Sequence, residues 1–198
     1  MSTLTSPAAT VGPRTVLADL VPGTRVRDGV LITFGALFTG LMAQITIPMT
    51  PVPMTGQTLA VGLVGATLGM RRGTASMLLY VLLGFALPVY ADGGSGVETL
   101  WGASGGYLLG FVLATALIGR LAEAGADKKV HLAFAAFVLA QLLVFVPGVV
   151  VLQAVTDMSW GDAIHHGFTV FIVGGLVKAA VGGALLPAAW KAVRRYEG

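Results

Sequence analysis

Apolar residues fill most of the chain in long stretches, separated by short polar or glycine-rich segments. A helix needs about 20 mostly apolar residues, or about 17–25 with tilt, to cross a bilayer. We therefore interpret the stretches as transmembrane helices. The predicted spans cover residues 30–47, 59–70, 74–89, 105–121, 130–152 and 168–190. The pattern predicts an all-α, polytopic membrane protein with six transmembrane helices.

The segment between the first two spans is irregular. Three prolines at residues 48–53 end the first span, because proline lacks the N–H donor that a regular helix needs. Irregular backbone at membrane depth is tolerated where protein covers it or where it lines a cavity. The residues alone favour a plain proline-rich turn here. The alternative is that residues 50–58 dip into the protein, where Thr55, Gln57 and Thr58 would offer neutral hydrogen-bonding groups to a cavity.

Composition supports the membrane interpretation. Apolar residues make up 56% of the chain and charged residues only 11%, against about 25% charged in soluble domains. A membrane β-barrel would alternate apolar and polar residues, whereas the apolar runs here are continuous. The chain has no cysteine, which excludes disulfides, thiolate metal ligands and a cysteine nucleophile.

Positive charges fall on one side of the predicted topology. They precede the first span, separate the second from the third and the fourth from the fifth, and follow the sixth: Arg14, Arg25, Arg27, Arg71, Arg72, Arg120, Lys128, Lys129, Lys191, Arg194 and Arg195. The opposite loops hold acidic residues and no Lys or Arg: Asp92, Glu98, Asp157 and Asp162. Loops rich in Lys and Arg stay in the cytoplasm, so we expect both termini there, in a multi-pass protein of the cell membrane.

The same topology sets the expected boundaries. We predict a cytoplasmic tail over residues 1–28, a six-helix transmembrane domain over 29–192 and a second cytoplasmic tail over 193–198. The polar, Pro/Ser/Thr-rich segment 1–22 has no apolar core before a cleavage site, so we expect an irregular tail rather than a signal peptide. The net charge of +3 does not indicate nucleic acid, because no basic amphipathic run or aromatic stacking platform accompanies it.

Arg120 lies at the end of the fourth predicted span, so Lys178 is the one cation in the interior of a span. Placing it there costs about 2.5–3.5 kcal/mol on insertion scales, so such a residue usually faces a cavity or a partner. We favour a contact with a carboxylate or carbonyl oxygen of a ligand. The alternative is a structural lysine that is capped by backbone carbonyls or extends its amine to an interface.

Two outer segments allow a functional and a plain interpretation. The glycine-rich loop 90–104, flanked by Tyr90 and Tyr107, suits a lid over a cavity, but its aromatic residues also suit interfacial anchoring. The second outer segment holds Asp, His and Trp residues: Asp157, Trp160, Asp162, His165 and His166. We interpret it as a solvated loop and expect no metal, since ligand geometry is demanding.

Other chemistry has little support in the sequence. It contains no GxxxxGK[ST] or HExxH motif, so we expect neither ATP hydrolysis nor zinc-protease activity, and no cofactor. Small residues lie one turn apart in the first span, at Gly35, Thr39 and Ala43 and at Ala36 and Gly40. Such stripes let another helix approach closely, either within the protein or from a partner.

Several motifs recur in a fixed order between residues 44 and 119. They are PVPMTGQT at 51–58, LGMRRG at 68–73 followed by Tyr80 and Gly84, LPVY at 87–90, GGSG at 93–96 and GASGGYL at 102–108. In order and spacing they resemble the BioY family, the biotin-binding S components of energy-coupling factor (ECF) transporters. The resemblance weakens in the fifth span and returns around Lys178.

The resemblance implies a six-helix protein with an outward-facing biotin pocket, and high-affinity biotin capture rather than enzymatic activity. It implies a membrane-embedded coupling subunit (T component) and two ABC ATPases as partners, and it assigns the coupling face to Ala36 and Gly40. The family's last helix commonly carries an Asp three residues before a Lys, both contacting the ligand. Lys178 matches the Lys, but Gly175 occupies the acidic position, so Asp92, Glu98 or a polar side chain would have to supply the acceptor.

We therefore expect a ligand site formed by six residues: Thr55, Gln57, Tyr90, Asp92, Tyr107 and Lys178. Three other functions stay open. The first is an S component for another vitamin or a stand-alone vitamin permease. The others are an intramembrane metal-dependent enzyme and a structural assembly subunit without a ligand.

Overall fold

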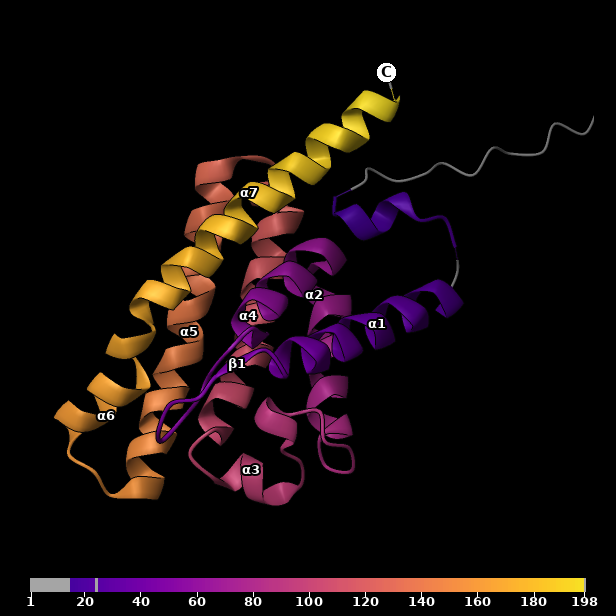
Figure 1. Cartoon of the computed structure of the whole chain (residues 1–198). Coiled ribbons are helices and arrows are strands. Elements are labelled where there is room, and N and C mark those ends of the chain that lie inside the picture. The colour runs from indigo at the N-terminus through magenta and orange to yellow at the C-terminus, as the bar shows by residue number, and fades with distance from the viewer. Residues whose placement is uncertain (1–14, 24, 198) are drawn as a thin grey trace, which may run out of the picture.

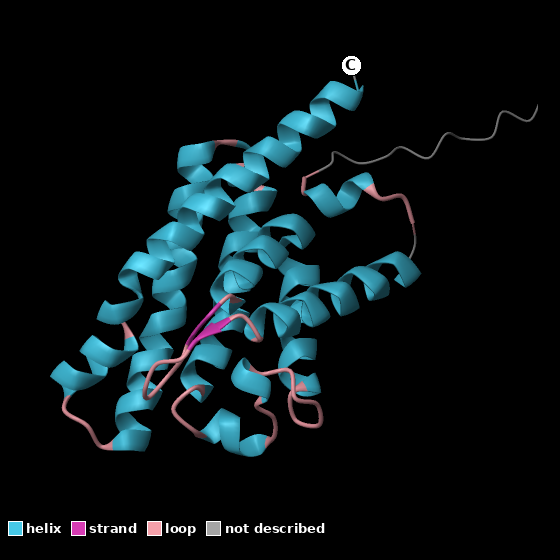
Figure 2. Cartoon of the chain, viewed as in Figure 1, coloured by secondary structure: helices cyan, strands magenta, loops and turns pink. Residues whose placement is uncertain are grey.

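The computed structural model describes residues 15–23 and 25–197 and is almost entirely helical (Figures 1 and 2). The long helices are α1 (Arg25–Ala43), α2 (Gln57–Leu83), α4 (Gly105–Glu123), α5 (Val130–Thr156) and α7 (Ile172–Glu197). The shorter elements are the strands β1 (Thr46–Ile47) and β2 (Met54–Thr55), the helices α3 (Val97–Trp101) and α6 (Trp160–Gly167), and 3-10 turns at Leu17–Leu20, Ala91–Gly93, Ala126–Lys128 and Thr169–Phe171. The predicted all-α fold is confirmed, with one short hairpin added.

Helix α2 folds back on itself at Gly69. This residue has φ 81° and ψ 175°, a conformation that glycine adopts at little cost. Beyond the break, a Cβ added to Gly73 would lie 3.1 Å from the Cα of Gly65. At the far ends of the two arms, Gln57 Nε2 donates a hydrogen bond to the hydroxyl of Tyr80 at 2.7 Å. The arms therefore form the second and third predicted spans.

The predicted position of this turn was wrong. We expected residues 70–73 to form the connection, but they already belong to the second arm of α2. Gly69 alone reverses the chain direction, because its positive φ turns the backbone sharply and no longer loop is needed. The arginines at 71 and 72 consequently lie on helix rather than in a loop.

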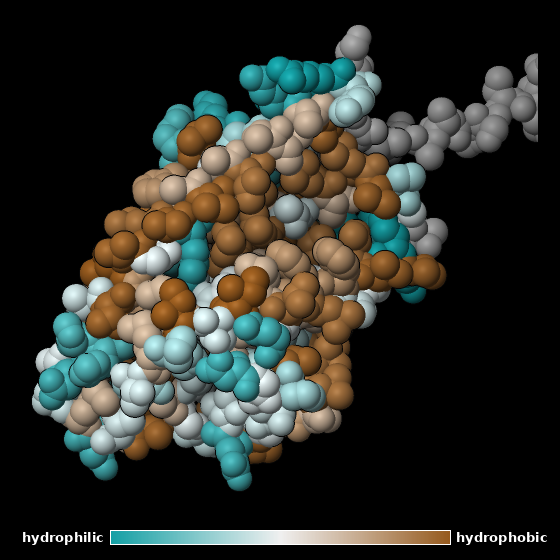
Figure 3. Space-filling model, in the orientation of Figure 1, coloured by the Kyte–Doolittle hydropathy of each residue, from teal (hydrophilic) through white to brown (hydrophobic). Residues whose placement is uncertain are grey.

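Four helical stretches in the described part of the chain are long and apolar enough to cross a membrane. They are Arg25–Ala43, Gly105–Glu123, Val130–Thr156 and Trp160–Tyr196. With the two arms of α2, they account for the six predicted crossings. Large apolar side chains such as Phe34, Val146 and Val173 are 64–74% exposed, and apolar surface covers much of the visible side of the molecule (Figure 3). Lipid is the natural solvent for this surface.

Glycines let the helices pack backbone to backbone. A Cβ on Gly119 of α4 would lie 2.6 Å from the backbone nitrogen of Met70, and one on Gly110 would lie 2.7 Å from the Cα of Val144 in α5. The ring of Phe137 in α5 leaves no room for a side chain at Gly62 or Gly182. Because small residues allow close approach, α2, α4, α5 and α7 pack into one continuous core.

The segment before α1 is ordered, contrary to our expectation of an irregular tail; residues 1–14 lie outside the described residues. Val16 is 1% exposed, and Asp19 accepts hydrogen bonds from the backbone N–H groups of Thr15 and Val16. Arg72 pairs with Asp19 at 2.5 Å and with Asp28 at 3.4 Å. Burial raises the pKa of Asp19, but the hydrogen bonds from Arg72, Val16 and Thr15 outweigh it and lower the pKa.

The cation-bearing connections meet at one end of the bundle. Glu123 accepts a hydrogen bond from the backbone N–H of Met70 at 2.9 Å. Nearby in the chain, the buried Asp127 accepts from Trp190 Nε1, and Lys128 Nζ lies 4.6 Å from the centre of the Trp190 ring. Burial raises the pKa of Asp127 despite the Trp190 hydrogen bond. These contacts join the end of α4, the turn of α2 and the C-terminal part of α7, as the predicted topology requires.

We expect Gly119→Ala to lower the free energy of unfolding by about 1–3 kcal/mol, because the added methyl group meets backbone that cannot move aside. The matched control is Gly29→Ala in α1, where a Cβ meets nothing within 4 Å. Thermal unfolding of the detergent-purified variants measures the difference. Equal melting temperatures for the two variants would contradict the packing argument.

Candidate ligand-binding site

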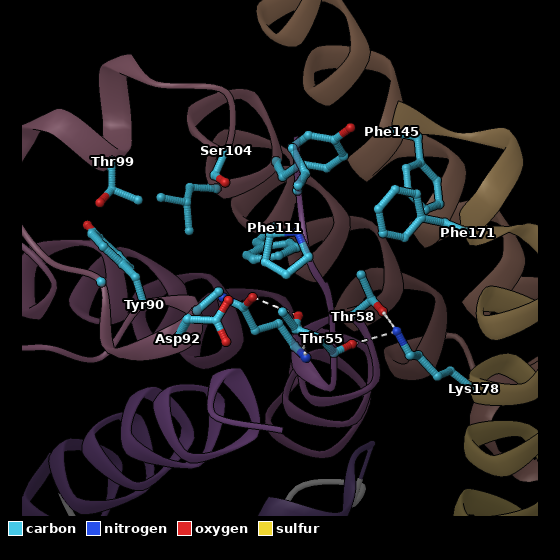
Figure 4. A pocket seen from close by; sticks show the side chains of 17 residues that line it. Thr55, Thr58, Tyr90, Asp92, Thr99, Ser104, Phe111, Phe145, Phe171 and Lys178 are labelled. Carbon is cyan, nitrogen blue, oxygen red and sulfur yellow. Dashed lines mark hydrogen bonds between the residues drawn. The ribbon is translucent and has the colours of Figure 1, made fainter. Parts of the chain in front are cut away.

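A cavity of about 180 Å³ lies where the hairpin, the loop after α2 and the ends of several helices meet (Figure 4). Its walls are Val52, Pro53, Thr55, Gln57, Thr58, Tyr90, Ala91, Asp92, Gly94, Thr99, Ser104, Tyr107, Leu108, Phe111, Phe145, Phe171 and Lys178. All six residues predicted from the sequence are among them. The structure brings them together, and their contact with a ligand stays a prediction.

Lys178 reaches from α7 to the hairpin. Its Nζ donates to the backbone oxygen of Thr55 at 2.6 Å and to Thr58 Oγ1 at 3.0 Å (Figure 4). The side chain is partly buried, and no carboxylate pairs with it in the described structure. Since an ammonium group has three N–H donors, two neutral acceptors leave one donor for a ligand oxygen. A structural lysine would account for the two contacts but not for the cavity beside them.

Thr55 and Gln57 belong to a hydrogen-bonded chain in the cavity wall. Thr55 Oγ1 donates to Gln57 Oε1 at 2.7 Å, and Gln57 Nε2 donates to the hydroxyl of Tyr80. Tyr80 in turn donates to the backbone oxygen of Val89 at 3.2 Å. Gln57 is only 5% exposed. The network fixes the start of α2 and holds these polar groups in place before any ligand arrives.

Tyr90 and Asp92 position the loop that covers one side of the cavity. The Tyr90 hydroxyl donates to the backbone oxygen of Val81 at 2.7 Å, and its ring packs on Gly84. Asp92 Oδ1 accepts from Thr46 Oγ1 at 2.6 Å. Gln44 adds two bonds, donating to the Tyr90 carbonyl and accepting from the N–H of Gly93. The loop is thereby tied to the end of α1 and to β1.

The sequence did not identify the aromatic half of the site. Phe111, Phe145 and Phe171 line the cavity, and Tyr107, whose hydroxyl donates to the Gly167 carbonyl at 2.8 Å, packs edge-on against Phe145 with ring centres 6.2 Å apart. Phenylalanines within continuous apolar runs carry no signal that separates them from core or lipid-facing residues. Thr99 and Ser104 were missed for a similar reason, since serine and threonine are ordinary in loops.

The position expected to be acidic lies beside Gln141 rather than in the cavity wall. Gln141 Nε2 donates to the backbone oxygen of Gly175 at 2.9 Å. Of the two acids that we considered as replacements, Asp92 lines the cavity and Glu98 does not.

The small-residue stripes of α1 face inward. Ala36 is 1% exposed, and Thr39 and Ala43 are fully buried. A Cβ on Gly35 would meet Ser76, and one on Gly40 would lie 3.3 Å from Val89. In this structure α2 and the segment after it cover the face that we assigned to a partner, so packing within the protein is its observed role. The coupling role of Ala36 and Gly40 stays a prediction.

The outer Asp/His segment shows no metal-site geometry. No group of three or more His, Cys, Asp or Glu residues able to hold a metal occurs in residues 15–23 and 25–197. Asp162 instead takes part in the N-cap of α6, where Ser159 Oγ accepts from the Asp162 N–H at 3.1 Å and donates to the Asp162 carboxylate at 2.7 Å. Asp157 ends α5 in the left-handed conformation.

The fold matches a solved S component for biotin from an ECF-type ABC transporter. The TM-score is 0.77, the match covers 84% of this chain and 92% of that chain, and sequence identity is 23%. This likeness defines the class of protein: the chain has the S-component fold.

The sequence comparisons then identify the family. The BioY family model matches residues 13–195. The chain is 36% identical over 160 residues to the biotin transporter BioY2 of Lactococcus lactis subsp. cremoris, covering 79% of this chain and 86% of that protein. It is 40% identical over 152 residues to the biotin transporter BioY of Thermotoga maritima, covering 73% and 86%. The chain belongs to the BioY family, which confirms the resemblance found in the motifs.

We expect Lys178→Met to leave the melting temperature of the purified protein nearly unchanged. Methionine fills a similar volume, and removing a cation that is costly to hold within a membrane span offsets the loss of the hydrogen bonds to Thr55 and Thr58. Lys191→Met, at an exposed lysine of the same helix, is the matched control and should be neutral. A fall of more than about 5 °C for Lys178→Met alone, well over 1 kcal/mol for a chain of this size, would show that the lysine is structural.

Proposed function

We propose that the protein is the biotin-binding S component of an ECF-type ABC transporter. The observation that carries the proposal is Lys178, which presents an amine with a spare donor inside a largely apolar cavity. The relatives named above are biotin transporters. Biotin joins an apolar bicycle and a valeryl chain to a ureido head and a carboxylate. Apolar pockets with a few convergent polar groups suit such ligands.

The cavity chemistry divides between polar and aromatic walls. Lys178 would donate to an oxygen of biotin, while Phe111, Phe145 and Phe171 would pack on its apolar parts. Thr55 and Gln57 would act mainly by holding the hairpin beside the lysine, since their polar atoms already bond within the protein. Tyr90 and Asp92 would hold the covering loop, and Tyr107 would support Phe145. A transport role needs no catalytic residue in this chain.

Charge distribution supports an outward-facing site. The cavity lies at the end of the bundle opposite the contacts of Arg72, Glu123 and Asp127. By the positive-inside rule, the cation-rich end would face the cytoplasm and the cavity the exterior. Biotin would be captured outside and delivered inward by a T component and two ABC ATPases, which would hydrolyse the ATP.

We expect Lys178→Met to weaken biotin binding about 100-fold, because it removes a charged hydrogen bond from a buried site. Isothermal titration calorimetry on the detergent-purified protein measures the affinity. Lys191→Met is the matched control and should bind as the wild type does. Wild-type affinity in Lys178→Met would remove the lysine from the site and with it the main support for the proposal.

The absence of cysteine makes the topology directly testable. We expect a cysteine at Ser95, exposed in the loop over the cavity, to react with a membrane-impermeant maleimide on intact cells. A cysteine at Ala124, exposed at the end of α4, should react only after the cells are permeabilised. The reverse pattern would place the cavity on the cytoplasmic side and exclude capture from outside.

A further inference from the structure

Gln141 is the one polar residue in the middle of α5. Every other residue from 132 to 152 is apolar, glycine or proline. Its side chain points from α5 toward α7 and is only 6% exposed. Burying an amide in such surroundings is costly unless both its ends are hydrogen-bonded.

Only one end of this amide has a partner in the described structure. Nε2 donates to the Gly175 carbonyl at 2.9 Å. Because a carbonyl can only accept, Nε2 must face it, which fixes the orientation of the amide. Oε1 is buried and accepts no hydrogen bond from the described residues. Buried polar atoms are nearly always paired, so this acceptor points to a donor that residues 15–23 and 25–197 do not supply.

Gln141 lines a second, smaller cavity of about 90 Å³ between α5 and α7. Phe145 and Phe171 line both this cavity and the main one, so their two rings form the partition between them. The ring centres lie 5.7 Å apart. Exposed Leu142, Ile172 and Leu176 line the second cavity as well, so its outer side is apolar.

Gly175 makes room for the amide. A Cβ at this position would lie 2.7 Å from Gln141 Oε1, so any larger residue would displace it. Lys178 lies three residues further along α7, close to one helical turn. The Gln141 acceptor thus lies beside Gly175, one turn of α7 from Lys178, and the two residues line cavities that share the rings of Phe145 and Phe171.

We infer that Gln141 determines ligand specificity by accepting an N–H from the ureido head of the ligand, with Phe145 and Phe171 turning aside so that the two cavities join. The inference rests on the proposed function. A ureido group carries a carbonyl oxygen flanked by two N–H donors. Lys178 donates to that carbonyl, and Gln141 Oε1 accepts from an adjacent N–H. Lys178 and Gln141 together then recognise both the carbonyl oxygen and an N–H of the ureido head.

Calorimetry on the full-length purified protein tests this assignment, using biotin and biotin methylated on the ureido nitrogens. Gln141→Met keeps a long unbranched side chain and removes the acceptor. It should bind biotin about tenfold more weakly than the wild type, the loss expected for one hydrogen bond in a buried site. Methylation should lower the affinity of the wild type. It should lower the affinity of Gln141→Met much less, because this variant already lacks the acceptor for the ureido N–H.

The matched control is Gln153→Met, the same change in the same helix at a residue whose amide donates to the Met158 carbonyl. It should bind biotin like the wild type and lose affinity fully on methylation. Unchanged biotin affinity in Gln141→Met, or an equal methylation penalty in Gln141→Met and the wild type, would overturn the inference alone. No biotin binding by the wild type would overturn the proposed function as well.

Discussion

The structure depends on covering the irregular backbone between α1 and α2. Lipid offers no hydrogen-bond partners, so polar backbone at membrane depth must be satisfied by protein. The hairpin pairs Thr46 with Thr55 and Ile47 with Met54, Gly56 donates to the Ile45 carbonyl, and Lys178 donates to the Thr55 carbonyl. Lys178 thus supplies a donor for a hairpin carbonyl, and the hairpin supplies an acceptor for the buried ammonium group. Their meeting joins α1, α2 and α7 and forms one wall of the cavity.

Close helix packing carries this arrangement. Hydrophobic burial gives little drive for helices to associate within lipid, so van der Waals packing at small residues becomes decisive. Gly65, Gly73 and Gly119 bring the two arms of α2 and helix α4 to backbone contact. The inward stripe on α1 packs by the same rule, which explains why Ala36 and Gly40 are buried here. The surface left outside consists of larger apolar side chains that lipid can solvate.

The sequence predicts the membrane spans well, but it predicts the turns and the cavity residues only in part. Hydropathy and the one-sided cations are strong signals, because both report directly on the bilayer. The turn at Gly69 was placed a few residues too late, since one glycine with positive φ looks like any other glycine in an apolar run. Lys178 was identifiable because a cation in lipid is costly, and Thr55 and Gln57 because they belong to the PVPMTGQT motif that resembles the BioY family. Phe145, Phe171 and Gln141 were missed, since their roles come from the pairing of α5 with α7, which no local pattern encodes.

Titration of the purified wild-type protein with biotin and a panel of other vitamins tests the central claim most directly. The account predicts saturable one-to-one binding of biotin, with affinity well above that for the other vitamins. The cavity should accept biotin because it combines aromatic walls, a lysine donor and few other charges. Tight binding of a different vitamin, or no binding of any, would contradict the account.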